Sequence, residues 1–194
     1  MSVERFPYGT LYRGVIDPRT ALQFGHYSRA FRRYDPTLFF EPPINKAVGL
    51  RGVKKAWLDY PDGTKNNRAI AKDYIQITED PTDWCVKAAS AFVALCDLVD
   101  EITETPSHTR FLQSYAPGTV LATHDDKGIS SRIVGLSGAG EFRMHDSVNH
   151  DRVTDVVVIG PGDIFHFMAN GLHSAINPSV TDYRETVNLI DIVI

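Results

Sequence analysis

Hydrophobic and polar residues alternate over short runs throughout the C-terminal half of the chain. After Pro106 these runs are separated by Pro-Gly, Lys-Gly, Ser-Gly and Asn-Gly pairs, which are typical of turns between strands. The pattern predicts eight strands, over residues 110–115, 119–124, 131–136, 141–144, 153–159, 164–168, 172–177 and 184–192. Eight short strands joined by polar turns favour a double-sheet jelly roll.

A helical period precedes these strands. Apolar residues recur at steps of three and four from Trp84 to Ile102, so they form one stripe along a helix. Asp80 is the expected N-cap and Pro81 the first helical residue. The pattern predicts one long supporting helix over residues 80–105, packed on the sheet by its apolar stripe.

The first 79 residues show little regular period. Residues 1–45 are rich in Pro, Tyr and Phe, which suggests irregular chain and short strands over the core, and 53–60 predict a strand that closes in a turn at 61–63. The expected fold class is mainly β with helices (α+β), in a single domain spanning 1–194. It has an N-terminal extension (1–79) that is a candidate substrate lid, a supporting helix (80–105) and a double-stranded β-helix (jelly roll) core (109–194).

Composition agrees with a globular protein, with 43% hydrophobic and 23% charged residues. No apolar run approaches the length of about 18 residues that a membrane span needs. The first residues lack the apolar core of a signal peptide. We therefore expect a cytoplasmic protein without a membrane partner.

Charge is unevenly distributed along the chain. Residues 1–75 contain thirteen Lys or Arg and seven Asp or Glu, a net charge of +6, whereas the remainder has seven and seventeen, a net charge of −10. Aromatic residues stand among the cations at Phe31, Tyr34, Trp57 and Tyr60, a mixture that suits single-stranded nucleic acid. The competing interpretation is a solvated basic surface with the aromatic side chains buried beneath it.

The candidate chemistry begins with a His-x-Asp pair. If residues 124–126 are extended, His124 and Asp126 lie on one face and can hold one ion, while Asp125 points to the opposite face. Two histidines and one carboxylate hold iron(II) with three positions open. Among the seven histidines only His124 has an acid two residues on. We choose His173 as the third ligand, since His145 and His150 lie in a polar stretch typical of a loop.

A family resemblance follows from these residues. His124-x-Asp126, a second histidine roughly fifty residues later and Arg184 about ten residues beyond it resemble the Fe(II)/2-oxoglutarate-dependent dioxygenase superfamily over residues 110–191. Tyr115-Ala-Pro-Gly followed by His124-Asp-Asp-Lys is similar to the AlkB-type nucleobase demethylases. In that branch's pattern, however, Gln113 replaces an Asn and Ile190 a second Arg. His173-Ser-Ala-Ile-Asn-Pro before Arg184 is similar to the aspartyl/prolyl hydroxylase branch.

The resemblance implies an enzyme that uses Fe(II), 2-oxoglutarate and O2 to hydroxylate a C–H bond, with succinate and CO2 as co-products. It implies that His124, Asp126 and His173 are the catalytic iron ligands. Four further residues are implied to bind the co-substrate, namely Arg184, Thr186, Tyr115 and Gln113. We favour a small molecule or an amino acid or peptide as substrate, with an AlkB-like reaction on a nucleobase as the alternative.

A second class of protein shares the same fold. Gly118 followed by five residues and His124, with Gly162-Asp163 leading to His173 and Asn177, is similar to the two metal motifs of cupins. Cupins include isomerases, oxygenases and binding modules. A cupin-type metal-binding protein is therefore the other alternative. Arg184 favours the oxoglutarate interpretation, because a cupin does not need a cation there.

Overall fold

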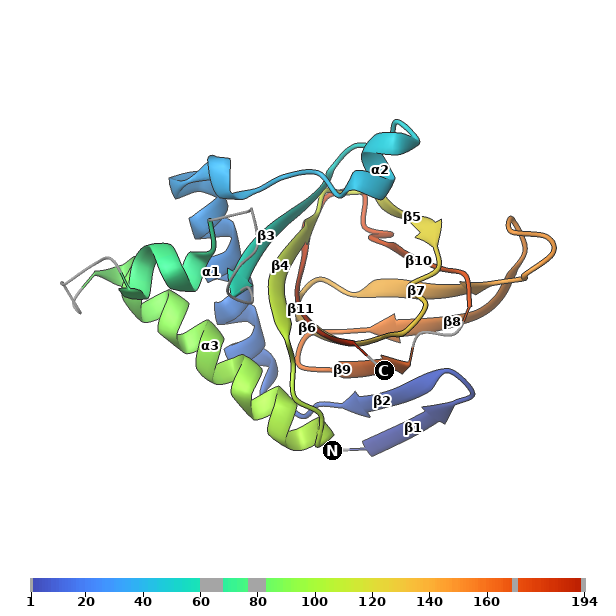
Figure 1. The fold of residues 1–194 in the computed structure, drawn as a ribbon, viewed down its shortest axis with the longest axis horizontal. Coiled ribbons are helices and arrows are strands. Elements are labelled where there is room, and N and C mark those ends of the chain that lie inside the picture. The colour runs from blue at the N-terminus through green and yellow to red at the C-terminus, as the bar shows by residue number, and fades with distance from the viewer. Residues whose placement is uncertain (1, 60–67, 77–82, 169–170, 193–194) are drawn as a thin grey trace.

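The computed structural model describes residues 2–59, 68–76, 83–168 and 171–192. Two antiparallel sheets face each other, and two long helices cover the outer face of the larger sheet (Figure 1). The larger sheet has seven strands in the order β1-β2-β9-β6-β11-β4-β3, and the smaller has four in the order β5-β10-β7-β8. This is a double-stranded β-helix of mainly β content with helices, as the strand pattern predicted.

The C-terminal strands agree with the sequence prediction to within two residues at every end. They are β4 (Thr109–Tyr115), β5 (Val120–His124), β6 (Ile129–Ser137), β7 (Gly140–His145), β8 (Val153–Ile159), β9 (Ile164–Met168), β10 (His173–Ile176) and β11 (Arg184–Ile192). Successive side chains point to opposite faces. The large sheet therefore turns one row of residues toward the helices and the next toward the small sheet.

The helical layer rests on the larger of two cores. Leu112, Val134, Val187 and Leu189 from the large sheet pack there with apolar residues of the helices. The second core fills one end of the space between the sheets. It consists of Leu11, Ile133, Phe142, Met144, Val157, Ile159, Phe165 and Phe167.

The predicted supporting helix is α3 (Trp84–Thr103). Central residues of the expected stripe are buried, among them Ala88, Phe92 and Val99, whereas Trp84 at its start is exposed. Asp83 is the N-cap, and its carboxylate accepts a hydrogen bond from the Cys85 amide at 2.6 Å. The start expected at Asp80 and Pro81 lies outside the described residues.

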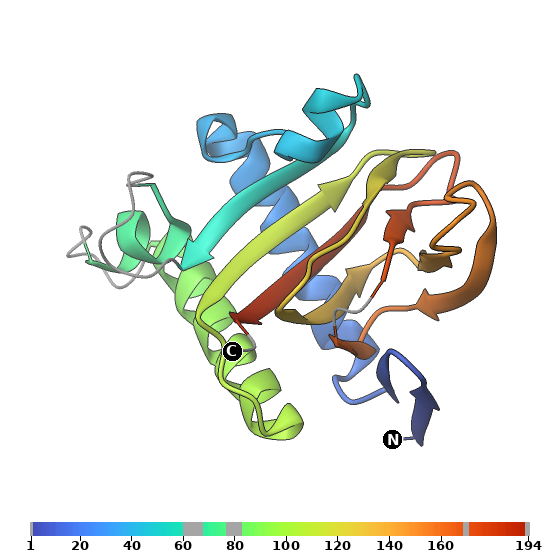
Figure 2. The ribbon, with the colours of Figure 1, turned by 45° about the vertical axis from the view of Figure 1, so that its right-hand side comes forward.

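The expectation of irregular chain in residues 1–45 was wrong, because α1 (Pro18–Tyr34) is a second long helix. Its buried face consists of Ala21, Gly25, Ser28 and Phe31, so small and polar residues interrupt the apolar period that marks most amphipathic helices. A Cβ atom at Gly25 would lie 2.8 Å from Cβ of Ser137. The helix therefore approaches the sheet more closely than larger side chains permit. Figure 2 shows α1 crossing behind the large sheet.

The rest of the N-terminal extension is built largely into the large sheet. The hairpin of β1 (Ser2–Phe6) and β2 (Gly9–Arg13) forms one end of the sheet, and the predicted strand β3 (Val53–Asp59) forms the other. Two short helical segments, η1 (Pro36–Leu38) and α2 (Pro43–Ala47), lie between α1 and β3. The π-helical turn η2 (Lys72–Gln76) lies between β3 and α3. The turn expected at 61–63 lies outside the described residues. A lid function for the extension stays a prediction.

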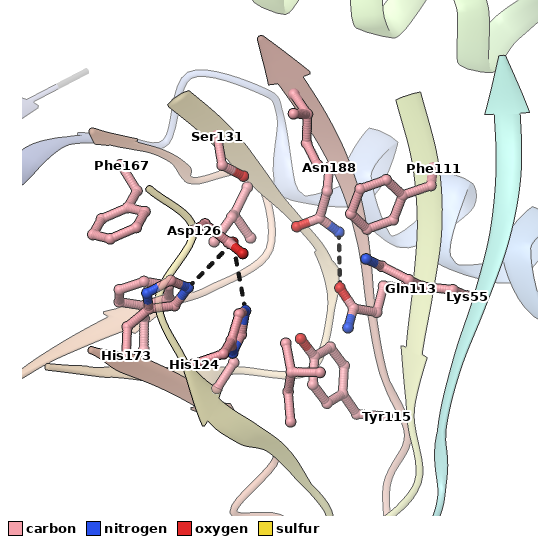
Figure 3. A pocket seen from close by; sticks show the side chains of 15 residues that line it. Lys55, Phe111, Gln113, Tyr115, His124, Asp126, Ser131, Phe167, His173 and Asn188 are labelled. Atoms are coloured by element: carbon pink, nitrogen blue, oxygen red, sulfur yellow. Dashed lines mark hydrogen bonds and ion pairs between the residues drawn. The ribbon is translucent and has the colours of Figure 1, made fainter. Parts of the chain in front are cut away.

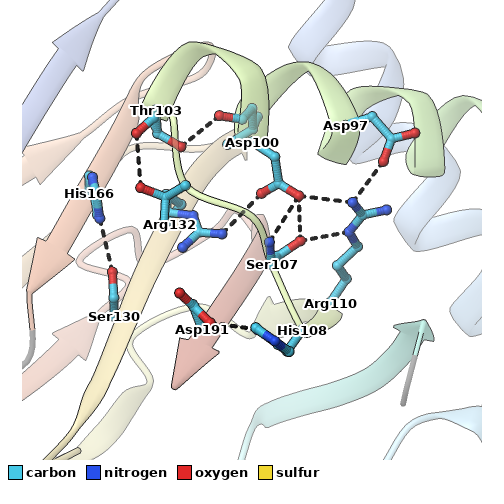
Figure 4. Close-up of polar contacts among 12 residues, drawn as sticks. Asp97, Asp100, Thr103, Ser107, His108, Arg110, Ser130, Arg132, His166 and Asp191 are labelled. Atoms are coloured by element: carbon cyan, nitrogen blue, oxygen red, sulfur yellow. Dashed lines mark hydrogen bonds and ion pairs between the residues drawn. The ribbon is translucent and has the colours of Figure 1, made fainter. Parts of the chain in front are cut away.

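A buried polar network joins the C-terminal half of α3 to the large sheet (Figure 4). Arg132 on β6 is fully buried and donates to the Asp100 carboxylate at 3.0 Å. The same carboxylate accepts from Ser107 at 2.6 Å and from Arg110 at 2.9 Å. None of the helices within the described ranges is long and apolar enough to cross a membrane.

Candidate metal centre

Three predicted ligands come together at one end of the space between the sheets. His124 ends β5, Asp126 follows two residues later, and His173 begins β10 beside His124. The Asp126 carboxylate lies 3.4 Å from Nε2 of His124 and 3.5 Å from Nε2 of His173 (Figure 3). One ligand atom from each residue lies within 4.8 Å of the others, so these residues fit one metal ion.

Backbone carbonyls orient both histidine rings. Nδ1 of His124 lies 2.7 Å from the Ala122 carbonyl, and Nδ1 of His173 lies 3.1 Å from the Gly171 carbonyl. A carbonyl oxygen only accepts hydrogen bonds, so each Nδ1 carries a proton. Both Nε2 atoms therefore face Asp126 as the nitrogens available to a metal, an orientation that such outer contacts commonly fix at metal sites.

The electrostatics of the site suit a cation. Burial raises the pKa of Asp126, but its contacts with both histidines outweigh this effect and hold the net pKa far below its ordinary value. Burial lowers the pKa of His124, and the hydrogen bond and charge of Asp126 outweigh it in the other direction. At neutral pH Asp126 is therefore an anionic ligand. A metal that binds here displaces any proton on Nε2 of His124.

The alternatives to this ligand set lie elsewhere. Asp125 forms an ion pair with Lys127 at 3.8 Å instead of joining the cluster. His145 ends β7, where its Nε2 lies 2.8 Å from the Ser174 hydroxyl, and His150 follows in the next loop. Within the described ranges, the one cluster with the spacing of a metal site is His124, Asp126 and His173.

A cavity extends from these three residues along the large sheet. Tyr115 and Gln113, both on β4, line it as the prediction for co-substrate contacts requires. Burial raises the pKa of Tyr115, and the nearby charge of Arg184 only partly opposes this, so the hydroxyl remains a donor. Gln113 accepts from Nδ2 of Asn188 at 3.4 Å, while its own buried Nε2 has no hydrogen-bond partner among the described residues.

The other two predicted contacts are buried next to the cavity but do not line it. Arg184, which pairs with Tyr115 across β11 and β4, is fully buried with its guanidinium 4.9 Å from the Tyr115 ring centre. It donates to the Ile176 carbonyl at 3.3 Å, and in the part of the chain that the structure describes its Nε has no partner. Thr186 accepts from Asn188 at 2.9 Å. Neither Arg184 nor Thr186 is among the residues that line the cavity.

Sequence reasoning identified five of the fifteen residues that line the cavity and missed the others, three of which contribute to its inner wall on the large sheet. Lys55 on β3, Phe111 on β4 and Asn188 on β11 all line the cavity. Alternation along a strand could have identified two of them. Phe111 lies two residues before Gln113, and Asn188 two residues after Thr186, so each shares a face with a predicted contact. Lys55 is one of the thirteen cations of residues 1–75, for which the sequence suggested a nucleic-acid-binding or solvated basic surface.

Comparisons with known proteins agree with this architecture. No protein-family model matches the sequence, and no curated protein matches it in sequence. Among solved structures, the chain is similar to a prolyl-4-hydroxylase from Pseudomonas putida with a TM-score of 0.58 and 13% identity, over 97% of this chain and 94% of that one. At this identity the likeness shows the fold alone.

Two further structures resemble part of the chain. One is an uncharacterized conserved protein with a double-stranded β-helix domain from Klebsiella pneumoniae, with a TM-score of 0.37 and 18% identity over 44% of this chain and 63% of that one. The other is an oxalate oxidase in complex with glycolate, with a TM-score of 0.37 and 15% identity over 44% and 42% of the two chains.

Proposed function

We propose that the chain is an Fe(II)- and 2-oxoglutarate-dependent dioxygenase that hydroxylates a C–H bond of a small molecule or of an amino acid or peptide. One observation supports this above all. Two histidines and one carboxylate converge at the end of a cavity, and Tyr115 in the wall of that cavity lies beside the buried guanidinium of Arg184. Two histidines and a carboxylate are the ligand set typical of non-haem iron oxygenases.

His124, Asp126 and His173 would hold the iron, which when bound supplies the oxidative chemistry. The protein contributes orientation and exclusion of water. The bonds from Nδ1 to backbone carbonyls fix the two rings. The Phe142 and Phe167 rings pack 5.0 and 4.7 Å from the His173 ring, so one side of the site is apolar and closed.

Arg184 and Tyr115 would bind the distant carboxylate of 2-oxoglutarate. Burying a cation without a counter-ion is costly, and the unpartnered Nε of Arg184 is consistent with a missing anion. A carboxylate matches the planar guanidinium with paired hydrogen bonds. The Tyr115 hydroxyl would donate from the cavity side, and Gln113 on β4 and Thr186 on the neighbouring β11 would complete the contact.

A cupin-type metal-binding protein is the second candidate, because Arg184 does not line the cavity. If Arg184 serves only to fill the interior, the metal site alone remains. A nucleobase substrate is less favoured. Several cations of the N-terminal half are engaged within the chain, including Arg51 with Glu41 at 2.7 Å and Arg68 with Asp35 at 2.6 Å.

Anaerobic titration with Fe(II) and 2-oxoglutarate tests the proposal. We expect the weak visible charge-transfer band of a keto acid chelated to iron in the wild type, and we expect His173→Ala to remove it. His166→Ala is the matched control, because His166 lies on β9, where its Nε2 is 2.9 Å from the Ser130 hydroxyl. The band should persist in this variant. Iron binding without the band would favour the cupin-type alternative.

A turnover assay tests the same ligands independently. In air, the wild type should convert 2-oxoglutarate to succinate, and a substrate should increase that rate. His124→Ala and Asp126→Ala should abolish conversion while circular dichroism shows the fold retained. A variant of either residue that still couples 2-oxoglutarate decay to product would refute the assignment.

A further inference from the structure

Lys55 reaches the cavity from an edge strand outside the eight-stranded core. On β3, alternate residues point to opposite faces of the sheet. Val53 is buried against Tyr115 and Ala175 between the sheets, so Lys55, two residues later, shares that inner face. Its neighbour Lys54 lies on the other face, where its ammonium is 3.6 Å from the Glu41 carboxylate.

The ammonium of Lys55 is held in a defined position within the cavity wall. Nζ lies 3.9 Å from the centre of the Phe111 ring, a cation–π contact that fixes its direction. The backbone of Lys55 exchanges two hydrogen bonds with Phe40, at 2.8 and 2.9 Å. Figure 3 shows the side chain extending from β3 toward Gln113 and Asn188. These contacts place the charge at the cavity instead of in solvent.

No salt bridge to Lys55 occurs within the described part of the chain, although many other cations there are paired. Burial lowers the pKa of Lys55 to about 8, with a small opposing effect from Asp126, so most of the ammonium is charged at neutral pH. A partly dehydrated cation that forms no salt bridge is poorly stabilised. Ligands with a negative group are therefore favoured beside it.

This position differs from that of the proposed co-substrate anchor. Lys55 pairs with Gln113 on β4, whereas Arg184 pairs with Tyr115, two residues further along the same strand. Gln113 itself pairs with Lys55 of β3 on one side and with Thr186 of β11 on the other. The two cations thus lie at separate places, with Lys55 in the cavity wall and Arg184 outside it beside Tyr115, and 2-oxoglutarate has only one distant carboxylate to bind.

We propose that Lys55 is a specificity-determining residue that binds a carboxylate group of the primary substrate and holds its C–H bond near the metal. The inference rests on the proposed function and names its substrate class, a small carboxylic acid such as a free amino acid. The Lys55 ammonium itself has three N–H donors. Two donors match the two oxygens of a carboxylate.

Matched pairs of ligands test this inference. Calorimetry on the anaerobic protein with Fe(II) and 2-oxoglutarate bound would compare L-proline, L-leucine and L-phenylalanine with their primary amides. We expect at least one acid to bind more tightly than its amide in the wild type. Loss of a buried charge partner costs about 2 kcal/mol or more, so Lys55→Met should reduce that preference by about 30-fold.

Two further variants separate charge from packing. Lys55→Arg should retain part of the preference, and Lys54→Met should leave it unchanged because Lys54 faces away from the cavity. Lys55→Met keeps an unbranched apolar chain over Phe111, and circular dichroism would verify its fold. The affinity for 2-oxoglutarate should fall in Arg184→Met and remain within about threefold of wild type in Lys55→Met.

Three outcomes would overturn the inference. They are an unchanged preference in Lys55→Met, a loss that falls on 2-oxoglutarate instead, and an absence of preference for acids in every pair. Failure of the proposed function has a different signature, because the wild type would then lack the charge-transfer band. In that case the same pairs would be compared on the Zn(II)-loaded protein, where a preference that depends on Lys55 would still support carboxylate binding.

Discussion

Arg184 occupies a narrow space between the two sheets. Its guanidinium lies between Gly140 on β7 and the Tyr115 ring, and a Cβ atom at position 140 would overlap it. Glycine at this position therefore lets a long buried cation pass between the sheets. The orientation of Arg184 toward Tyr115 therefore depends on the absence of a side chain at position 140 of the small sheet.

Gly140→Ala should therefore displace Arg184 without touching the metal ligands. We expect the affinity for 2-oxoglutarate to fall by about tenfold or more, as for other residues that orient a ligand indirectly, and the affinity for Fe(II) to stay unchanged. Gly160→Ala is the control, since its Cβ would meet only Asp163 at an ordinary 3.4 Å. Equal loss in both variants would mean that the effect is a general one on packing.

Sequence alone indicated the residues whose chemistry is tied to a short spacing. His124 and Asp126 are two residues apart, so their common position follows from strand geometry, although Asp126 itself lies just beyond β5. Lys55 could not be found in this way. Its importance depends on the pairing of β3 with β4, and such long-range register is not encoded in any local pattern.

At the scale of elements, α3 is attached to the sheet by charge as well as by its apolar stripe. Within the described ranges, the buried Arg132 side chain donates a hydrogen bond to the Asp100 carboxylate, whereas Nε and Nη1 of Arg132 have no partner. Removing one member of such a buried pair leaves the other charge uncompensated. The pair of Asp100 and Arg132 therefore stabilises the fold mainly because neither charge is left buried without its partner.

Asp100→Asn should lower the free energy of unfolding at pH 7 by about 3 kcal/mol. Hydrogen bonds from Ser107, Arg110 and Arg132 outweigh the effect of burial and hold the pKa of Asp100 below its ordinary value. The wild type binds this proton less readily when folded, so the stabilisation is present above the unfolded pKa near 3.9 and is lost as pH falls through the folded pKa.

Urea unfolding at several pH values would measure this difference. The gap between wild type and Asp100→Asn should narrow below about pH 4. Asp97→Asn is the matched control, because Asp97 also pairs with Arg110 but its side chain is 61% exposed, and exposed pairs contribute about 1 kcal/mol or less. If the difference in unfolding free energy between wild type and Asp100→Asn did not change with pH, the charge of the Asp100 carboxylate would not be the source of the stabilisation.

Most of the elements that sequence predicted bury large apolar residues, as α3 does with Phe92 and β9 with Phe165. The ends of the predicted strands were also marked by turn residues. Helix α1 has Gly25 and Ser28 on its buried face and was missed. Its Asp17-Pro18 start was a usable signal, since Asp17 caps the helix by accepting from the Thr20 amide at 3.1 Å.

At the scale of the whole molecule, the two sheets carry different parts of the site. The histidine ligands come from β5 and β10 of the small sheet, and Tyr115, Gln113 and Lys55 come from β4 and β3 of the large one. The ligands His124 and His173 are also far apart in the chain. A bound ion would therefore link distant segments and stabilise the folded state.

Metal binding should raise the melting temperature. An ion at about 100 times its dissociation constant stabilises the folded state by about 2.7 kcal/mol, which corresponds to about 5–10 °C for a chain of this size. Differential scanning calorimetry with Fe(II) under argon, followed by excess chelator, would measure the shift and its reversal. His173→Ala should show little of it; an equal shift in that variant would indicate binding elsewhere.

The position of Lys55 on an edge strand has a consequence for how proteins of this kind diverge. β3 pairs with one strand only and precedes the core that carries the metal ligands. Under the proposed assignment, substitutions on its inner face would alter the accepted substrate while leaving oxidation intact. Related proteins are then expected to differ first in β3, so that changes in this one strand are enough to change which substrate is oxidised.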